Sequence, residues 1–339
     1  DTPDIGLFLH DIIDAFSKYF MERNISLRDV SKEEADKVVS QLVDESLKDF
    51  KNNIFNSSNQ MKVLSSKLKR VVKRMVWIII NHIKNGEFEI EGTEIGFGKD
   101  KQFSAVEIEL SEGNKLVLSG VIDRIDIAKT EEGKYIRIID YKSYNKELKL
   151  SDIYYGLQLQ LLVYMDAAME NTEHDNEFTT ENELLPGGML YLKLDDPIMK
   201  TKKEISVEEI ESEIAKKLRM KGVILSDARL LKAMDSNMVS ESTVLDLSIK
   251  KDGSYTAKVP TASKEQFHHL MNHMKQILKK MGDEILSGNI QNEPIKKKGQ
   301  TPCEYCDYQL ICRFDKELGN QFRVIHDLKN EEVFRKIAD

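Results

Sequence analysis

The sequence predicts a mixed α/β fold in which helices cover a mixed sheet. Apolar residues recur every three or four positions through residues 1–86, and the spacing then changes to alternate positions. A further helical segment and a further strand follow the alternating region. The expected core is therefore a helix, a three-stranded antiparallel meander, a helix and a strand, with additional helices around it.

Residues 1–86 are expected to form three helices. The first contains "IGLFLHDIIDAFSKYF", with apolar residues at helical spacing. The second opens with Ser31 and Glu34, which have the spacing of a capping box. The third, "NQMKVLSSKLKRVVKRMVWIIINHI", is a long amphipathic segment.

Residues 87–200 are expected to form the α/β core. Its strands are the segments "FEIEGTEIGFG", "SAVEIEL", "KLVLSGVIDRIDIA", "KYIRIIDYKS" and "PGGMLYLKL". The turn segments "SEGN" and "TEEG" indicate hairpins within the meander. The segment "SDIYYGLQLQLLVYMDAAME" is expected to be the helix before the last strand.

The remainder is expected to complete a single domain over residues 1–339. Residues 201–290 are expected to be a helical support, and residues 291–339 hold all the cysteines. The chain opens without a methionine, which predicts that it is part of a longer protein.

Composition narrows the class of protein only in part. The formal net charge of −8 and the pI near 5.6 argue against a uniformly basic surface, although a local basic groove is compatible with both. The apolar run "VWIII" is too short to cross a bilayer, and no signal-peptide pattern opens the chain. We expect a cytoplasmic protein with no membrane partner.

Two acids and a lysine lie at the ends of two neighbouring strands. Asp140 and Lys142 share one face of their strand because alternate residues point the same way. The hairpin brings Asp123 of the previous strand beside them. Paired carboxylates favour a divalent cation, and oxygen ligands suit Mg²⁺ or Mn²⁺. With a lysine nearby, this set fits phosphodiester hydrolysis. The alternative is a surface ion-pair cluster that also includes Arg124.

The segments "GVIDRID", "IIDYKS" and "GLQLQLLVYMDA" resemble the motifs of the RecB-like branch of the PD-(D/E)xK nuclease superfamily. The resemblance implies the restriction-endonuclease-like core of that superfamily, in the element order given above. It also implies metal-dependent cleavage of DNA. Ile122 replaces the proline of the superfamily name, a departure that is ordinary in this branch.

The resemblance also implies roles for individual residues. Asp123 and Asp140 would bind the metal ion, and Lys142 would act on the scissile phosphate. His10, in "IGLFLHDIID", would join the metal shell, and the backbone carbonyl of Tyr141 would complete it. The alternative for His10 is a core histidine on an apolar helix face.

Two further residues match the Q-x-x-x-Y motif of this branch. Gln160 and Tyr164 lie one helical turn apart and would face the DNA and the catalytic lysine. They are the remaining candidates for catalytic roles. The alternative is a helix face whose polar side chains are satisfied by the sheet. Asp14, one turn from His10, is a weaker candidate for the metal shell.

The three cysteines, Cys303, Cys306 and Cys312, have the C-x2-C-x5-C spacing of metal ligands. Zinc accepts three thiolates and one other ligand, whereas a 4Fe–4S cluster normally takes four thiolates. Residues 6–328 resemble the nuclease region of AddB-type subunits of bacterial helicase-nucleases, in which a fourth cysteine lies upstream. The resemblance implies a 4Fe–4S cluster in the intact protein, acting as a staple. Three reduced thiols in this chain are the alternative.

The same resemblance implies a substrate and a partner. The substrate would be DNA, cut as single strands that a helicase delivers during double-strand-break repair and recombination. The partner would be an AddA-type helicase-nuclease subunit. No Walker A pattern occurs in this chain, so we do not expect the chain itself to be the motor. The alternatives are a stand-alone RecB-like iron–sulfur exonuclease and a catalytically silent DNA-binding or scaffolding module.

Basic residues could contact DNA outside the catalytic centre. Lys69, Arg70 and Lys73 lie in the segment "KLKRVVKR", and Arg124 follows Asp123. Each could neutralise a phosphate. A solvated helix face explains the first three as well.

Overall fold

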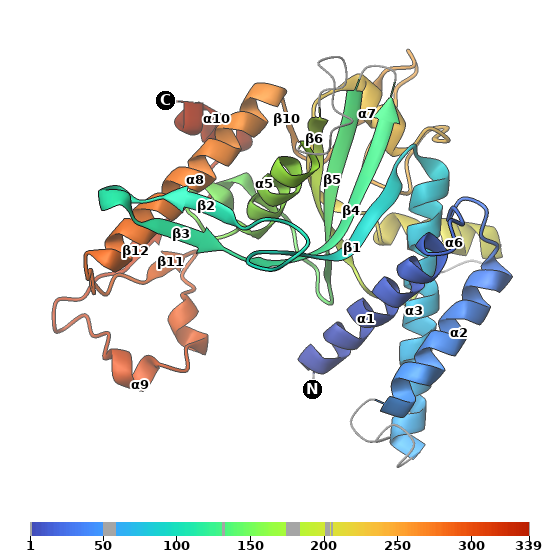
Figure 1. The fold of residues 1–339 in the computed structure, drawn as a ribbon, viewed down its shortest axis with the longest axis horizontal. Coiled ribbons are helices and arrows are strands. Elements are labelled where there is room, and N and C mark those ends of the chain that lie inside the picture. Colours follow the sequence, from blue (N-terminus) through green and yellow to red (C-terminus); the bar gives the residue numbers. More distant parts are fainter. Residues whose placement is uncertain are drawn as a thin grey trace.

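A six-stranded mixed sheet forms the centre of the molecule (Figure 1). The computed structural model describes residues 2–49, 59–130, 133–173, 184–200, 204 and 206–338. The strand order in the sheet is β1-β4-β5-β6-β7-β10. Strands β1, β4 and β5 are successive antiparallel neighbours, whereas β5 and β6 are parallel. The mixed sheet of the sequence prediction is therefore present.

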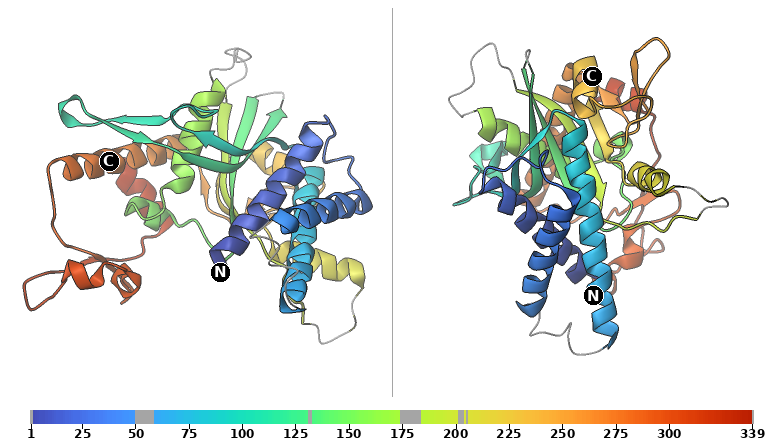
Figure 2. Two further views of the ribbon diagram at one scale, coloured as in Figure 1. Left: turned by 60° about the horizontal axis from the view of Figure 1, so that its bottom comes forward. Right: turned by 90° about the vertical axis from the view of Figure 1, so that its right-hand side faces the viewer.

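Three helices precede the sheet, as expected for residues 1–86. They are α1 (Thr2–Met21), α2 (Lys32–Asp49) and α3 (Asn59–Asn85). The Ser31 hydroxyl accepts a hydrogen bond from the backbone N–H of Glu34 at 3.1 Å, which caps α2. The helices α1 and α3 pack against each other, and each contributes fully buried residues, such as Ile12 and Val72. This packing holds α1 against β1, the strand at one edge of the sheet. The two views of Figure 2 show α1 and α3 beside the sheet.

The meander is present, but one of its expected strands is divided. The strands are β1 (Glu89–Phe97), β2 (Val106–Glu109), β3 (Lys115–Leu118), β4 (Gly120–Thr130) and β5 (Gly133–Lys142). The expected continuous strand "KLVLSGVIDRIDIA" is split at Ser119. Its first part pairs with β2 in a separate two-stranded sheet, and its second part pairs with β1 and β5. The three-stranded meander of the core is thus β1, β4 and β5.

The expected helix after the meander is two helices, α4 (Leu150–Tyr154) and α5 (Gln160–Glu173). Gly156 has a φ of +77°, a conformation that glycine adopts without strain, and it lies in the break. A β-carbon there would also lie 3.2 Å from side-chain carbons of Ile277 and Met281. The break makes Gln160 the first residue of α5, which then leads to β6 (Leu184–Lys193).

Residues 201–290 were expected to be a helical support, and this expectation is only partly right. The helices are α6 (Val207–Lys217), α7 (Ala228–Met234) and α8 (Lys264–Leu286). The same region also supplies strands β7 (Lys221–Leu225) and β10 (Thr261–Ala262) to the main sheet, and a small hairpin of β8 (Leu247–Ile249) and β9 (Tyr255–Ala257). Residues Gly222 to Leu225 are all buried, so both faces of this strand are covered. A search for alternating apolar residues does not detect such a strand.

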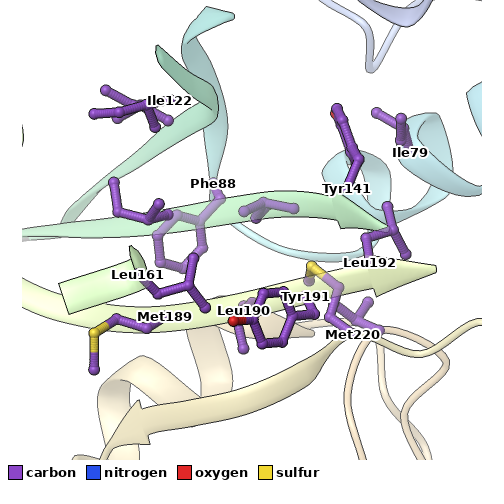
Figure 3. Packing of buried hydrophobic residues seen from close by; sticks show 14 of the residues in the cluster. Ile79, Phe88, Ile122, Tyr141, Leu161, Met189, Leu190, Tyr191, Leu192 and Met220 are labelled. Atoms are coloured by element: carbon purple, nitrogen blue, oxygen red, sulfur yellow. The ribbon is translucent and has the colours of Figure 1, made fainter. Parts of the chain in front are cut away.

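The two faces of the sheet have different covers. His82 of α3 lies beside Arg124 and Arg137 on one face, whereas α5 packs against β5 and β6 on the other. Figure 3 shows Ile79 of α3, Leu161 of α5 and Leu190 of β6 within the same buried cluster around these strands. The site described below lies where this core ends.

The C-terminal segment extends away from the sheet and then returns (Figure 1). It contains β11 (Ile295–Lys297), a short 3-10 helix (Pro302–Tyr305), α9 (Gln309–Cys312), β12 (Arg323–Ile325) and α10 (Asn330–Ala338). Strands β11 and β12 pair in parallel, and α10 packs against α8 and α4. In the described part of the chain, no helix has the length and apolar character needed to cross a membrane.

Candidate metal centre and catalytic residues

The candidate site is a row of acidic residues across three neighbouring strands. Arg124 of β4 pairs with Ile139 of β5, so the next residues on that line are Asp123 and Asp140. On the other side of β4, the pairing with β1 sets Glu94 opposite Asp123. Residues directly opposite one another in antiparallel strands have β-carbons about 5 Å apart. The hairpin therefore brings Asp123 and Asp140 together, as the sequence predicted.

His10 of α1 reaches this row from the edge of the sheet. Its Nδ1 atom lies 3.5 Å from Oδ2 of Asp123 and 3.9 Å from Oε1 of Glu94. Ligand atoms of His10, Glu94 and Asp123 all lie within 4.8 Å of one another, and all three side chains are partly exposed. One imidazole and two carboxylates are suitable ligands for Mn²⁺, and the carboxylates also suit Mg²⁺. The donor set fits a divalent metal ion.

Lys142 lies next to Asp140. Its ammonium group is 2.5 Å from Oδ2 of Asp140, which is almost completely buried. The same ammonium donates to Oε1 of Gln160 at 3.5 Å, and Gln160 donates through Nε2 to the hydroxyl of Tyr164 at 2.8 Å. The predicted Q-x-x-x-Y pair therefore contacts the predicted catalytic lysine. Asp140 pairs with this lysine and is not among the three side chains grouped above.

Tyr141 connects the acids to one another through its backbone. Its N–H donates a hydrogen bond to Oδ2 of Asp123 at 2.7 Å. Burial lowers the pKa of His10, and a hydrogen bond from its ring to the Tyr141 backbone opposes this change, as expected for a ring N–H that donates to a carbonyl oxygen. The two rings also meet edge to face, with centroids 5.5 Å apart. The expected position of the Tyr141 carbonyl beside the metal ligands remains a prediction.

The electrostatics of the row favour a bound cation. Burial raises the pKa of Asp123, and the neighbouring Asp140 raises it further. Burial also raises the pKa of Asp140, although Lys142 opposes the change. The pKa of Glu94 is raised by burial and by Asp14 and Asp11. A divalent ion would stabilise the charged form of these carboxylates.

Glu94 is the residue that the sequence analysis missed. It lies inside β1 but has a φ of +49°, which an acidic residue in a regular strand does not adopt. Gly92 and Gly96 flank it, and the pairing of β1 with β4 is irregular between Ile90 and Gly92. Glycines on both sides of an acid within one strand were the available signal of this irregular backbone.

Asp14, the weaker candidate for the metal shell, has other partners. Its carboxylate accepts a hydrogen bond from the hydroxyl of Thr93 at 2.6 Å and forms an ion pair with Lys18 at 2.9 Å. Asp14 therefore ties α1 to β1 near His10.

The expectation of a DNA contact at Arg124 is wrong, because the residue is completely buried. Its guanidinium donates to both carboxylate oxygens of Asp126, at 2.5 and 2.6 Å, and Arg137 donates to the same carboxylate at 2.8 Å. A buried guanidinium held in this way cannot reach a phosphate. Arg124 and Asp126 are instead a buried ion pair on the α3 face of the sheet.

The other three basic candidates lie on α3. Lys69 forms an ion pair with Asp44 at 2.8 Å, and Arg70 with Asp196 at 2.6 Å. Lys73 is half-buried. Asp196 follows β6. Strand β6 runs parallel to β5, so both strands end on the same side of the sheet. DNA contacts at these residues remain predictions.

The three cysteines lie on the C-terminal segment. Cys303 is half-buried, whereas Cys306 and Cys312 are exposed, and all three are free thiols. The amide of Asn292 lies 3.1 Å from the sulfur of Cys312. These accessible thiols are compatible with metal ligation, and the cluster remains a prediction.

Comparison with known proteins agrees with this fold. A family model described as the PD-(D/E)XK nuclease superfamily matches residues 1–313. The chain therefore belongs to the PD-(D/E)XK nuclease superfamily, and its mixed sheet is the core of that fold.

Comparison with individual curated proteins shows which members of this superfamily the chain is similar to. The chain is 42% identical over 337 residues to the B subunit of the ATP-dependent helicase/deoxyribonuclease of Acetivibrio thermocellus, and 42% identical over 338 residues to that of Alkaliphilus metalliredigens. It is 41% identical over 339 residues to the corresponding protein of Clostridium tetani. These matches cover 99% to 100% of this chain and 29% of each relative. The chain thus corresponds to less than a third of those proteins.

Proposed function

We propose that this chain is the nuclease region of an AddB-type subunit and hydrolyses phosphodiester bonds of DNA with a divalent metal ion. The observation that carries this proposal is the meeting of His10, Glu94 and Asp123 around one point, with Asp140 and Lys142 next to it. The family membership and the names of the relatives support it. The substrate is DNA, cut as single strands that a helicase delivers.

The residues have distinct roles in this proposal. His10, Glu94 and Asp123 hold Mg²⁺ or Mn²⁺, with Asp140 beside them. When bound, the ion stabilises charge at the phosphate and makes water more acidic. The Lys142 ammonium contacts a phosphate oxygen and offsets the negative charge that develops there.

Gln160 and Tyr164 act through Lys142. The Gln160 carbonyl oxygen accepts from the ammonium, and the Tyr164 hydroxyl fixes the amide of Gln160. A lysine has a long flexible side chain, so these contacts limit the positions of its charge. Asp140 contacts the same ammonium directly.

The proposal extends to the assembly that the relatives' name describes. The partner is an AddA-type helicase-nuclease subunit, and the complex acts in the cytoplasm in double-strand-break repair and recombination. The intact protein carries a 4Fe–4S cluster on Cys303, Cys306, Cys312 and a fourth cysteine outside this chain. Iron analysis of the full-length protein tests the cluster, and loss of iron in Cys306→Ser is the expected result.

Cleavage of labelled single-stranded DNA by the full-length protein tests the catalytic proposal. We expect cleavage with Mg²⁺ and none with EDTA. Asp140→Ala and Lys142→Ala should each lower the rate about a thousandfold or more, which corresponds to about 4 kcal/mol of transition-state stabilisation. Lys129→Gln, an exposed change at the opposite end of β4, is the control. Full activity in either site variant would disprove the assignment.

A further inference from the structure

The row of paired residues that holds the candidate centre continues across the sheet. Asp140 of β5 pairs with Tyr191 of β6, and Tyr191 pairs with Lys221 of β7. Neighbouring strands lie about 4.8 Å apart. Lys221 is therefore about 10 Å from Asp140 along the end of the sheet, counted between backbones.

Lys221 lines a cavity of about 530 Å³. The cavity lies between the start of β7, the end of α6, the loop after β5 and residues 327–330. Six basic and three acidic residues line it, although the whole chain has a net charge of −8. The basic residues are Lys149, Lys216, Lys217, Arg219, Lys221 and Lys258.

The acidic residues of the lining already have cationic partners. Asp246 forms an ion pair with Arg219 at 3.1 Å, and Glu147 forms one with Lys221 at 3.2 Å. Asp327 lies 2.5 Å from the ammonium groups of two lysines outside the cavity. These pairs leave a surplus of positive charge on the other lysines of the lining.

Lys149, Lys217 and Lys258 carry that surplus. Their side chains are exposed, and none forms an ion pair with another residue in the described part of the chain. Three ammonium groups around one cavity attract a polyanion and would release counterions on binding a phosphate backbone. The lining therefore has the charge of a phosphate-binding surface.

The loop that joins the centre to the cavity presents an aromatic ring. Tyr144 lies two residues beyond Lys142, and 58% of its surface is exposed. The ammonium of Lys146, in the same loop, lies 5.0 Å from the centre of the Tyr191 ring. An exposed aromatic ring next to a basic groove is the combination that binds unpaired bases together with their phosphates.

We propose that this cavity is a second substrate-binding subsite, which holds phosphates of single-stranded DNA next to the bond that is cut. The strand leaves the centre at Lys142, stacks a base on Tyr144 and places its phosphates against Lys149, Lys217 and Lys258. This inference rests on the proposed function, because it takes the substrate of that centre and extends its path. An unpaired strand is favoured over a duplex because the base must be free to stack on the tyrosine.

The test measures binding and cleavage by the full-length protein. The cavity variant is Lys149→Gln/Lys217→Gln/Lys258→Gln, and the matched control is Lys99→Gln/Lys129→Gln/Lys251→Gln, three exposed lysines that do not line the cavity. Binding of a labelled single-stranded oligonucleotide is measured by fluorescence anisotropy in EDTA over a series of salt concentrations. Cleavage with Mg²⁺ is then measured on the same oligonucleotide and on a nitrophenyl phosphodiester of thymidine, which is too short to reach the cavity.

We expect the cavity variant to bind the oligonucleotide at least tenfold more weakly than the control variant. The slope of log affinity against log salt should fall in magnitude by about two, because each single-strand phosphate contact contributes about 0.7. The loss of cleavage should be at least tenfold larger on the oligonucleotide than on the thymidine diester. Tyr144→Ala should weaken oligonucleotide binding on the order of tenfold and leave the salt slope unchanged.

Two negative results have different meanings. Equal affinity and equal salt slope in the cavity and control variants would overturn the subsite, even where the protein cleaves both substrates. Failure of the wild-type protein to cleave either substrate with Mg²⁺ would instead overturn the proposed function. The binding measurement in EDTA would still decide whether the cavity holds DNA.

Discussion

The carboxylate of Asp123 accepts a hydrogen bond from the backbone N–H of Tyr141 at 2.7 Å. This bond ties Asp123 of β4 to the residue of β5 that lies between the catalytic candidates Asp140 and Lys142. Tyr141 separates Asp140 from Lys142 in the sequence. Asp123 thus has a structural partner in addition to its place in the candidate metal site. The two roles can be separated, because the hydrogen bond needs only an oxygen acceptor, whereas binding of a divalent cation at this site also depends on the negative charge of the carboxylate.

Asp123→Asn is the change that separates them. The amide oxygen can still accept from Tyr141, so we expect the thermal unfolding midpoint to stay within a few degrees of the wild type. Loss of the charge should lower Mg²⁺-dependent cleavage about a thousandfold or more, or about 4 kcal/mol. The measurements are calorimetric unfolding and single-turnover cleavage. A well-folded variant that cleaves at the wild-type rate would contradict the role of this carboxylate.

Glu94→Gln tests the residue that only the structure revealed. The change keeps the size of the side chain and removes one of the three proposed ligands. We expect Mn²⁺ affinity, measured by titration calorimetry, to fall at least tenfold, and about 1.4 kcal/mol corresponds to that factor. Glu91→Gln, an exposed acid in the same strand, should leave the affinity unchanged. Equal affinities in the two variants would remove Glu94 from the metal site.

Tyr164→Phe tests how Lys142 is positioned. The variant keeps the ring that packs against Phe97, with centroids 5.8 Å apart, and removes the hydroxyl that accepts from Gln160. We expect kcat to fall about tenfold, a smaller loss than that of Lys142→Ala, because the lysine remains but its position is less restricted. Gln160→Ala should have a similar effect. In the double variant the two losses should not add, since both act on one chain of contacts; additive losses would show that they act separately.

His82→Leu should change how stability depends on pH. His82 is completely buried on α3, and no described residue forms a hydrogen bond with either ring nitrogen. Burial holds its pKa well below the usual 6.5, and Arg137 and Arg124 add to this effect. Below pH 6.5 the unfolded chain binds a proton that the folded chain excludes, so folding becomes less favourable by up to about 1.4 kcal/mol per pH unit.

Urea unfolding at pH 7.5 and pH 5.5 measures this effect. The wild type should lose about 1 to 1.4 kcal/mol more stability than His82→Leu over this interval, because the leucine variant lacks the titrating group. Other titrating groups contribute equally to both proteins. An identical loss in the two proteins would mean that His82 has the same pKa in the folded and the unfolded chain.

The sequence predicted the parts of the fold that depend on local pattern. Helical spacing located α1 to α3, and the hairpin turn set Asp123 beside Asp140, because residues close in sequence decide both features. The split at Ser119 was missed since each half of that segment alternates correctly by itself. The pairing of β7 with β6 was missed because contacts distant in sequence determine it.

The candidate site was predictable to the same extent. Asp123, Asp140, Lys142, Gln160 and Tyr164 lie together as their motifs implied, whereas Glu94 depends on an irregular backbone that its residue type does not disclose. Arg124 shows the opposite error. A charged residue beside a catalytic acid suggests a ligand contact, but burial against Asp126 is set by packing from α3, which the local sequence does not contain.

His10 belongs to the first helix and Tyr164 to the fifth, with the strands of the sheet between them. On the proposed mechanism, a chain still attached to the ribosome has no working centre until α5 has been synthesised and the intervening strands have paired. DNA near a growing chain is therefore not cut by it throughout that period. The order of the elements along the gene delays the onset of a destructive activity without any separate inhibitor.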